Sequence, residues 1–207
     1  MAEAKERCYK IILMGDESTE RARLFKYMAN LAPDKRKETR DSWTATFTVS
    51  DITVEVRVSD TPSKVVSPKS YYFSADGAIL VYDTTDLETL NNLQHWLKML
   101  RWARGKMQPV CALWGNKGSG WNSVEEANVT GFQDRNEEKV RLLAKVDVSN
   151  DDGHIMEQFN ELLKEIHFTH TKSYPSLRQN TGIDTGSVVH LDDYSNESKT
   201  GKSGCSC

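Results

Sequence analysis

The strongest constraint on the fold comes from three short apolar runs, each followed by a glycine or a polar residue. They cover residues 8–14, 78–82 and 110–114. Runs of this length are typical of β-strands, and their continuous apolar character indicates strands that are buried on both faces. Residues 140–148 form a fourth candidate strand. The sequence therefore predicts a parallel sheet with helices on both sides.

Two further runs alternate between apolar and polar residues. They cover residues 43–49 and 52–58, and only Ser50 and Asp51 separate them. This alternation with a two-residue connection predicts an antiparallel hairpin at one edge of the sheet. The charged stretch before it, residues 34–41, predicts a solvated loop.

Helical periodicity marks the segments between the strands. Apolar residues recur three or four positions apart near residues 24–31, 87–100 and 155–166, as on the buried face of a helix. Strands alternating with helices predict an α/β fold: a mostly parallel six-stranded sheet with one antiparallel edge strand and helices on both faces. In such folds ligands bind at the carboxyl ends of the strands.

Composition excludes several classes of protein. The 207 residues carry a net charge of −3, so a broad basic surface for nucleic acid is not expected. No apolar run approaches the roughly 20 residues of a membrane-spanning helix, and the N-terminus lacks a signal-peptide pattern. We therefore expect a cytosolic protein. Its four cysteines have neither disulfide-framework nor zinc-site spacing.

One long motif carries a family resemblance. Residues 70–86 read Ser-Tyr-Tyr-Phe-Ser-Ala-Asp-Gly-Ala-Ile-Leu-Val-Tyr-Asp-Thr-Thr-Asp, which looks very like the Rab branch of the Ras-like small GTPases. An ordinary buried strand followed by a capped helix is the alternative explanation of this motif. Shorter matches follow the family order, and they lie at residues 10–16, 60–61 and 115–117 and at Ser149.

The resemblance implies the Ras-like P-loop GTPase fold over residues 8–168. An N-terminal extension, residues 1–7, would precede this domain, and a flexible hypervariable tail, residues 169–207, would follow it. The resemblance also implies a site for GTP or GDP with Mg²⁺, Rab-type effectors as partners, and a role in vesicle trafficking.

The phosphate-binding loop departs from the family pattern G-x-x-x-x-G-K-[ST]. In that pattern backbone N–H groups cradle the phosphates, the Lys reaches the β and γ oxygens, and the hydroxyl binds Mg²⁺. Gly15 matches, whereas Glu20, Arg21 and Ala22 replace the Gly, the Lys and the Ser/Thr. We expect Glu20 to bring negative charge toward the phosphates, Arg21 to keep a cation there, and Ala22 to remove a metal ligand. Alternatively, Gly15 only ends a strand. The candidate loop residues are Gly15, Asp16, Glu17, Ser18, Thr19, Glu20, Arg21 and Ala22.

Asp60 aligns with the family Asp that helps to hold Mg²⁺, but the residues after it differ. Ser63 replaces the Gly that senses the γ-phosphate, and Lys64 replaces the Gln that orients the attacking water. The second metal ligand is Ser42 when Phe47 guides the alignment, with Thr44 as the alternative. No residue is therefore predicted to be catalytic.

The loops that read the guanine base are altered as well. The family motif Asn-Lys-x-Asp becomes Asn116 and Lys117 followed by Ser119, which is a weaker hydrogen-bond partner than the Asp. The family Ser-Ala-Lys becomes Ser149 and Asn150 followed by an aspartate. We expect guanine selectivity to fall.

Three functional hypotheses follow from these departures. A charge-assisted hydrogen bond contributes about 1.5–3 kcal/mol, so losing three or four would weaken nucleotide binding by roughly 10⁴- to 10⁷-fold if they add. The first hypothesis is therefore a pseudo-GTPase that recruits partners through its switch-region surface. The alternative is a divergent working GTPase in which Arg21 holds the β-phosphate and an accessory protein assists slow hydrolysis. A weaker third hypothesis is a changed base preference, such as ATP.

The C-terminal Cys205-Ser-Cys207 resembles a Rab prenylation signal, although inert thiols are the alternative. Two geranylgeranyl chains would meet the two-signal requirement for stable anchoring. Prenylation and escort proteins would then be partners. The protein would lie on the cytoplasmic face of an intracellular membrane and would also have a cytosolic pool. Trp43, in the switch-I region, is the candidate effector contact if it is exposed; otherwise it packs in the interior.

Overall fold

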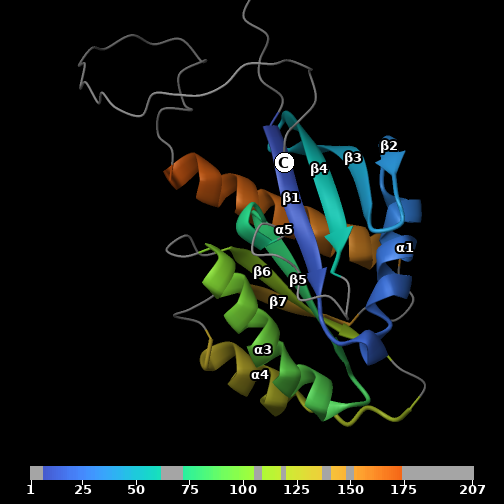
Figure 1. Cartoon of the computed structure of the whole chain (residues 1–207), viewed down its shortest axis with the longest axis vertical. Helices are drawn as coiled ribbons and strands as arrows, with labels where there is room; N and C mark the ends of the chain where they lie inside the picture. The colour runs from blue at the N-terminus through green and yellow to red at the C-terminus, as the bar shows by residue number, and fades with distance from the viewer. Residues whose placement is uncertain are drawn as a thin grey trace, which may run out of the picture.

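The computed structural model describes residues 7–61, 72–104, 109–117, 120–136, 141–147 and 152–173, the last strand by its backbone alone. A single seven-stranded sheet with the order β2-β3-β4-β1-β5-β6-β7 runs through the molecule (Figure 1). Its strands are β1 (Arg7–Met14), β2 (Lys35–Glu38), β3 (Ser42–Val49), β4 (Ile52–Asp60), β5 (Gly77–Asp83), β6 (Val110–Asn116) and β7 (Arg141–Asp147).

The predicted α/β fold class is confirmed. Strand β1 is parallel to both β4 and β5, and β6 and β7 extend the parallel part. The predicted hairpin is β3 and β4, which pair antiparallel. The structure adds β2, which pairs antiparallel with β3 at the sheet edge. The prediction of a loop over residues 34–41 was therefore wrong at residues 35–38, because backbone pairing needs no apolar pattern there.

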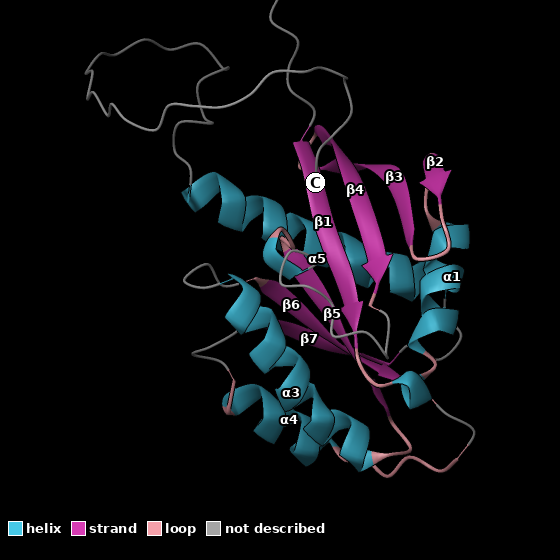
Figure 2. Ribbon diagram, in the orientation of Figure 1, coloured by secondary structure: helices cyan, strands magenta, loops and turns pink. Residues whose placement is uncertain are grey.

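The helices cover both faces of the sheet (Figure 2). They are η1 (Glu17–Thr19), α1 (Arg21–Leu31), α3 (Leu87–Arg104), α4 (Glu126–Asp134) and α5 (Asp152–Ser173). Because successive side chains of a strand point to opposite faces, β1 contributes to two cores. Ile11 and Leu13 pack in the core with α1 and α5, whereas Ile12 and Met14 pack in the core with α3 and α4.

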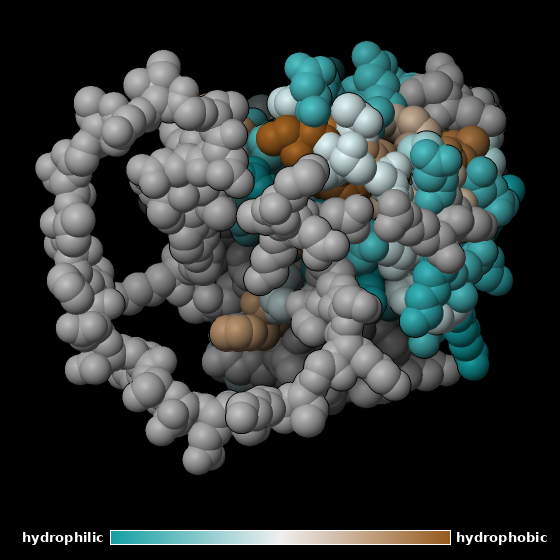
Figure 3. Space-filling model, turned by 90° about the horizontal axis from the view of Figure 1, so that it is seen from above, coloured by the Kyte–Doolittle hydropathy of each residue, from teal (hydrophilic) through white to brown (hydrophobic). Residues whose placement is uncertain are grey.

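Helix α5 runs to Ser173, so the predicted start of the tail at residue 169 falls inside this helix. No helix in the described part of the chain has both the length and the apolarity needed to cross a membrane. On the face seen in Figure 3, hydrophobic residues stand among hydrophilic ones. The large exposed hydrophobic residues come from separate elements, and they are Tyr27, Ile52, Phe73, Trp102, Trp121 and Phe168.

Candidate functional site

The candidate site lies at the carboxyl end of β1, where the chain turns through η1 into α1. Gly15 has φ +150°, and a Cβ atom there would stand 2.3 Å from the Val81 carbonyl oxygen of β5. A side chain at residue 15 is therefore excluded by the close approach of two backbones. This packing explains the glycine whether or not a phosphate ever binds beside it.

Backbone hydrogen bonds within the loop use N–H groups that the family pattern directs at phosphate. The N–H groups of Thr19 and Glu20 donate to the carbonyl oxygens of Asp16 and Glu17, both at 3.3 Å. The Thr19 hydroxyl also donates to the Asp16 carbonyl at 2.7 Å. The loop is a short 3₁₀ turn closed by its own hydrogen bonds, with Glu17 and Ser18 exposed.

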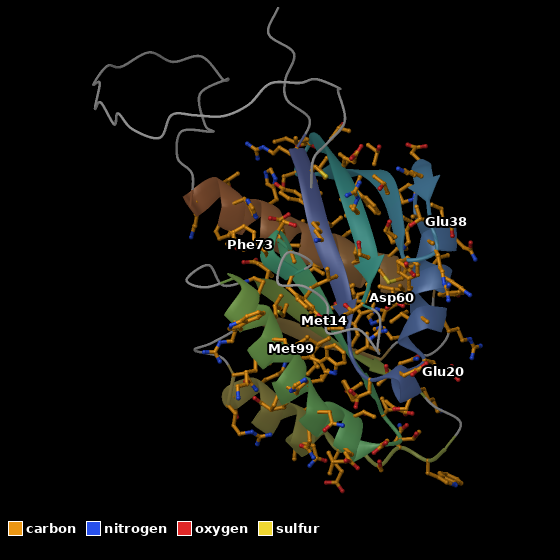
Figure 4. All side chains as sticks on the ribbon, in the orientation of Figure 1. Met14, Glu20, Glu38, Asp60, Phe73 and Met99 are labelled. Carbon is orange, nitrogen blue, oxygen red and sulfur yellow. The ribbon has the colours of Figure 1, made fainter. Side chains whose placement is uncertain are left out.

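Glu20 occupies a left-handed backbone conformation, with φ 52° and ψ 27°, at the position of the family glycine. Its carboxylate accepts a hydrogen bond from Arg23 Nη1 at 3.0 Å, and both side chains are exposed. In Figure 4 Glu20 lies at the outer side of the loop. The expectation that its negative charge points toward the phosphates is therefore wrong. The replacement of the family glycine by Glu20 therefore places a side chain on a residue with a left-handed backbone.

Arg21, the first residue of α1, is buried with 3% of its side chain exposed. Its Nε donates to Asp60 Oδ1 at 2.5 Å, its Nη1 donates to the Gly15 carbonyl at 2.5 Å, and its Nη2 donates to the Thr61 carbonyl. We call these contacts the Arg21 clamp. The clamp joins the start of α1 to the ends of β1 and β4, and it uses all three guanidinium nitrogens.

The Thr61 end of this clamp is itself fixed to β1. Thr61 is fully buried, and its hydroxyl and its N–H both donate to the Leu13 carbonyl, at 2.6 and 3.2 Å. Burial raises the pKa of the Asp60 carboxyl, and the neighbouring Arg21 charge opposes that rise. Figure 4 shows Asp60 at the end of β4, where it faces α1.

Three more hydrogen bonds fix the loop from its other side. The Asp16 carboxylate accepts from Asn92 Nδ2 at 2.8 Å and from Trp96 Nε1 at 2.9 Å, both on α3. Asn116, at the end of β6, donates from Nδ2 to the Thr19 carbonyl at 2.8 Å. The loop is thus held by α3, β4 and β6 together.

The sequence of this chain matches a known protein family and several of its members. A family model described as the Ras family matches residues 10–168. This chain belongs to the Ras family. Its relatives include two proteins of Arabidopsis thaliana: "Ras-related protein RABA4b", 27% identical over 79% of this chain and 75% of the relative, and "Ras-related protein RABA1h", 25% identical over 95% and 93%. "Ras-related protein RABD1" of the same organism is 30% identical over 64% and 65%.

Members of the Ras family in general bind GTP or GDP together with Mg²⁺, but the described residues of this Rab-like protein do not fit the metal. Ala22 has no ligand oxygen, and Asp60 is paired with Arg21. Ser42 Oγ lies 2.9 Å from the Thr39 hydroxyl. Among the described residues, no group of three or more His, Cys, Asp or Glu side chains could hold a metal ion.

The remaining predicted site residues of this Rab-like protein are only partly placed. Asn116 donates a hydrogen bond to the Thr19 carbonyl of the loop, and the next residue, Lys117, has an exposed side chain. Several others lie outside the described residues, and these are Ser63, Lys64, Ser119, Ser149, Asn150, Cys205 and Cys207.

Trp43 cannot serve as the predicted effector contact of this Rab-like protein. Only 1% of its side chain is exposed, and its ring lies 6.1 Å from that of Phe159 on α5. The alternating sequence of β3 indicated that Trp43 is buried, because it places Trp43 on the same face as Phe47. Phe47 is also buried against Phe159. The packing alternative is therefore the one that the structure supports.

A second polar cluster lies at the amino end of β1 and contributes nothing to the candidate site. Tyr9 Oη and His167 Nδ1 are 2.8 Å apart, and His170 Nε2 lies 3.0 Å from Asp76 Oδ1. The other Asp76 carboxylate oxygen accepts from the Lys10 N–H at 2.8 Å. Sequence analysis did not identify this cluster. Its members come from β1, α5 and the start of β5, and no local pattern links them.

Burial shapes the protonation of this cluster. It lowers the pKa of His167, and the nearby positive charges of Arg7 and His170 lower it further. Burial also raises the pKa of Tyr9. The pair between Tyr9 and His167 is therefore favoured in its neutral form.

Proposed function

We propose that this Rab-like protein acts in intracellular vesicle trafficking as a pseudo-GTPase with weak or lost GTP binding and hydrolysis. It recruits Rab-type effectors through its switch-region surface. Geranylgeranyl chains on Cys205 and Cys207 tether it to the cytoplasmic face of an intracellular membrane. The Rab relatives and the terminal Cys-Ser-Cys motif support this proposal.

The Arg21 clamp is the observation that carries the pseudo-GTPase proposal. A lysine at this position would extend a point charge toward the phosphates, whereas the Arg21 guanidinium is satisfied by three protein oxygens. Nucleotide binding would require breaking a buried ion pair, at a cost of about 3–5 kcal/mol if Asp60 is left unpaired. The self-bonded Thr19 and Glu20 N–H groups would have to be released as well.

A working GTPase is the competing function. Gly15, Asp60 and Asn116 favour it, because each keeps the family residue type at the end of its strand. The two functions differ in one measurable property, which is the affinity of the folded protein for nucleotide with Mg²⁺.

The deciding experiment extracts any bound nucleotide from the purified full-length chain and then titrates GTP, GDP and ATP with and without Mg²⁺. We expect no copurified nucleotide and no binding tighter than about 0.1 mM. Stoichiometric GDP or GTP that is lost when Mg²⁺ is chelated would overturn the proposal and establish the working GTPase.

The chain offers a matched test of the cause. The triple variant Glu20→Gly, Arg21→Lys, Ala22→Thr restores the family motif, and Arg23→Lys is a control on the exposed side of the same helix. We expect Mg²⁺-dependent nucleotide binding to improve in the triple variant alone. A folded triple variant that binds no better than wild type would show that the clamp does not block the site.

A further inference from the structure

A groove lies between α3 and the end of α4, away from the candidate site. It has a volume of about 550 Å³ and is lined by Gln94, Leu97, Lys98, Arg101, Trp102 and Asn136. Leu97 and Asn136 are buried and form its floor, and 63% of Trp102 is exposed. The Asn136 amide donates to the Phe132 carbonyl at 2.7 Å, which ties that residue to α4.

The lining chemistry suits a peptide that carries apolar and acidic side chains together. Arg101 and Trp102 follow Lys98 by three and four residues along α3, so both lie beside it on the helix surface. Neither Lys98 nor Arg101 has an ion-pair partner in the described part of the chain, and no lining residue is acidic. Trp102 offers a broad apolar surface beside these two positive charges.

The sequence beyond α5 contains a segment with this chemistry. Residues 188–194 read Val-Val-His-Leu-Asp-Asp-Tyr, which places two adjacent carboxylates directly after an apolar run. We propose that this segment docks in the α3–α4 groove. Leu191 lies against Leu97 and Trp102, and Asp192 and Asp193 pair with the two cations.

The connecting chain is long enough for this docking. Fourteen residues, 174–187, separate the end of α5 from the segment. A chain of that length with the dimensions of a Gly/Ser-rich linker would have an r.m.s. span of about 20 Å, and full extension would span roughly 45 Å. The ends of α3 and α5 lie on the same side of the molecule (Figure 1). The groove is therefore within reach of the segment on its own chain.

Tethering makes a weak contact sufficient. A short flexible linker gives an effective concentration of about 1 mM. A segment whose affinity as a separate peptide is only about 0.1 mM would then be docked about ten times as often as it is released. Docking does not depend on the nucleotide site, so this proposal stands or falls separately from the pseudo-GTPase proposal.

Hydrogen exchange on the full chain tests the proposal. We expect the amides of residues 188–194 to exchange about tenfold more slowly than those of an unstructured peptide. The double variant Lys98→Glu, Arg101→Glu should abolish this slowing. The matched control is Lys26→Glu, Lys37→Glu, two exposed lysines on α1 and β2, and it should leave the slowing unchanged.

A charge exchange makes the test specific. Adding Asp192→Lys and Asp193→Lys to the Lys98→Glu, Arg101→Glu variant should restore the slow exchange. Exchange at the unstructured rate in wild type, or slowing that survives the Lys98→Glu, Arg101→Glu change, would overturn the proposal. Slowing that grows with protein concentration would identify a second copy as the occupant and would equally overturn docking within one chain.

Discussion

The two ends of β1 carry buried polar clusters of different kinds. The carboxyl end meets the Arg21 clamp, in which one guanidinium donates to a carboxylate and to two carbonyl oxygens. The amino end meets Tyr9, His167, His170 and Asp76, where histidines supply the nitrogen atoms. One cluster is therefore centred on an arginine, whereas the other contains His167, whose pKa is lowered by burial.

The two clusters differ in how they respond to mutation and to pH. The Arg21 clamp is lost if one of its partners is removed, and it weakens in acid when Asp60, whose pKa is raised by burial, takes up a proton. The amino-end cluster changes whenever His167 takes up a proton. We therefore expect mutation to affect the carboxyl end most strongly, and pH to distinguish the amino end.

The largest effect should follow from Arg21→Ala. This change leaves the Asp60 carboxylate and the Gly15 and Thr61 carbonyls without their donor, and breaking a buried pair in this way costs about 3–5 kcal/mol. Urea unfolding at pH 7.5 measures the free energy of unfolding. Arg23→Ala is the matched control, because that neighbouring arginine is 83% exposed and its surface pair contributes at most about 1 kcal/mol. Similar losses for the two variants would contradict the importance of the clamp.

An intermediate effect should follow from Asp16→Ala. The Asp16 carboxylate accepts hydrogen bonds from Asn92 and Trp96, and hydrogen bonds to a charged group contribute about 1.5–3 kcal/mol. We expect Asp16→Ala to lower the free energy of unfolding by about 2 kcal/mol, measured in the same urea titration. Glu17→Ala changes the adjacent exposed carboxylate and should cost less than about 0.5 kcal/mol. A loss for Asp16→Ala no larger than this control would show that the loop is not fixed through α3.

The smallest effect should be a change in pH dependence on His167→Gln. The lowered pKa of His167 means that the unfolded chain takes up its proton first as the pH falls below about 6.5. Its stabilising contribution is therefore present above that pH and is lost as the pH falls toward the folded-state pKa. We expect the stability difference between wild type and His167→Gln to shrink between pH 7.5 and pH 5.5.

Thermal unfolding at several pH values provides this measurement. His95→Gln replaces an exposed histidine of α3, and this control variant should show the same change of stability with pH as wild type. A wild-type stability that rises relative to His167→Gln on acidification would reverse the predicted sign and contradict the assignment of a neutral His167.

The sequence predicted most of the fold, because continuous and alternating apolar runs report burial directly. The predicted strand at residues 140–148 became β7 (Arg141–Asp147), and the run at residues 8–14 became β1. Strand β2 was missed because its four residues are all charged and its pairing depends on the β3 backbone. Helix α4 lies in a polar stretch whose periodicity was too weak to assign.

The candidate site was predictable in position but not in geometry. The motif spacing assigned Gly15, Arg21 and Asp60 to one site, and the structure brings these three residues into contact. It could not foresee that Arg21 would bond to Asp60, because those residues are 39 positions apart and the pairing arises from the fold. The contact between Asp16 and Trp96 spans 80 positions and left no local signal. The outward turn of Glu20 likewise depends on its neighbour Arg23.

The Arg21 clamp also has a consequence for how the stability of the folded state depends on its surroundings. A protein stabilised by a bound ligand gains RT ln(1 + [L]/Kd), so its unfolding temperature shifts with the ligand supply. Because the cation here is covalently part of the chain, its contribution obeys no such mass action. Dilution, dialysis or chelation cannot remove it. The contribution of this cation to the folded fraction is therefore independent of the concentration of any small molecule around it.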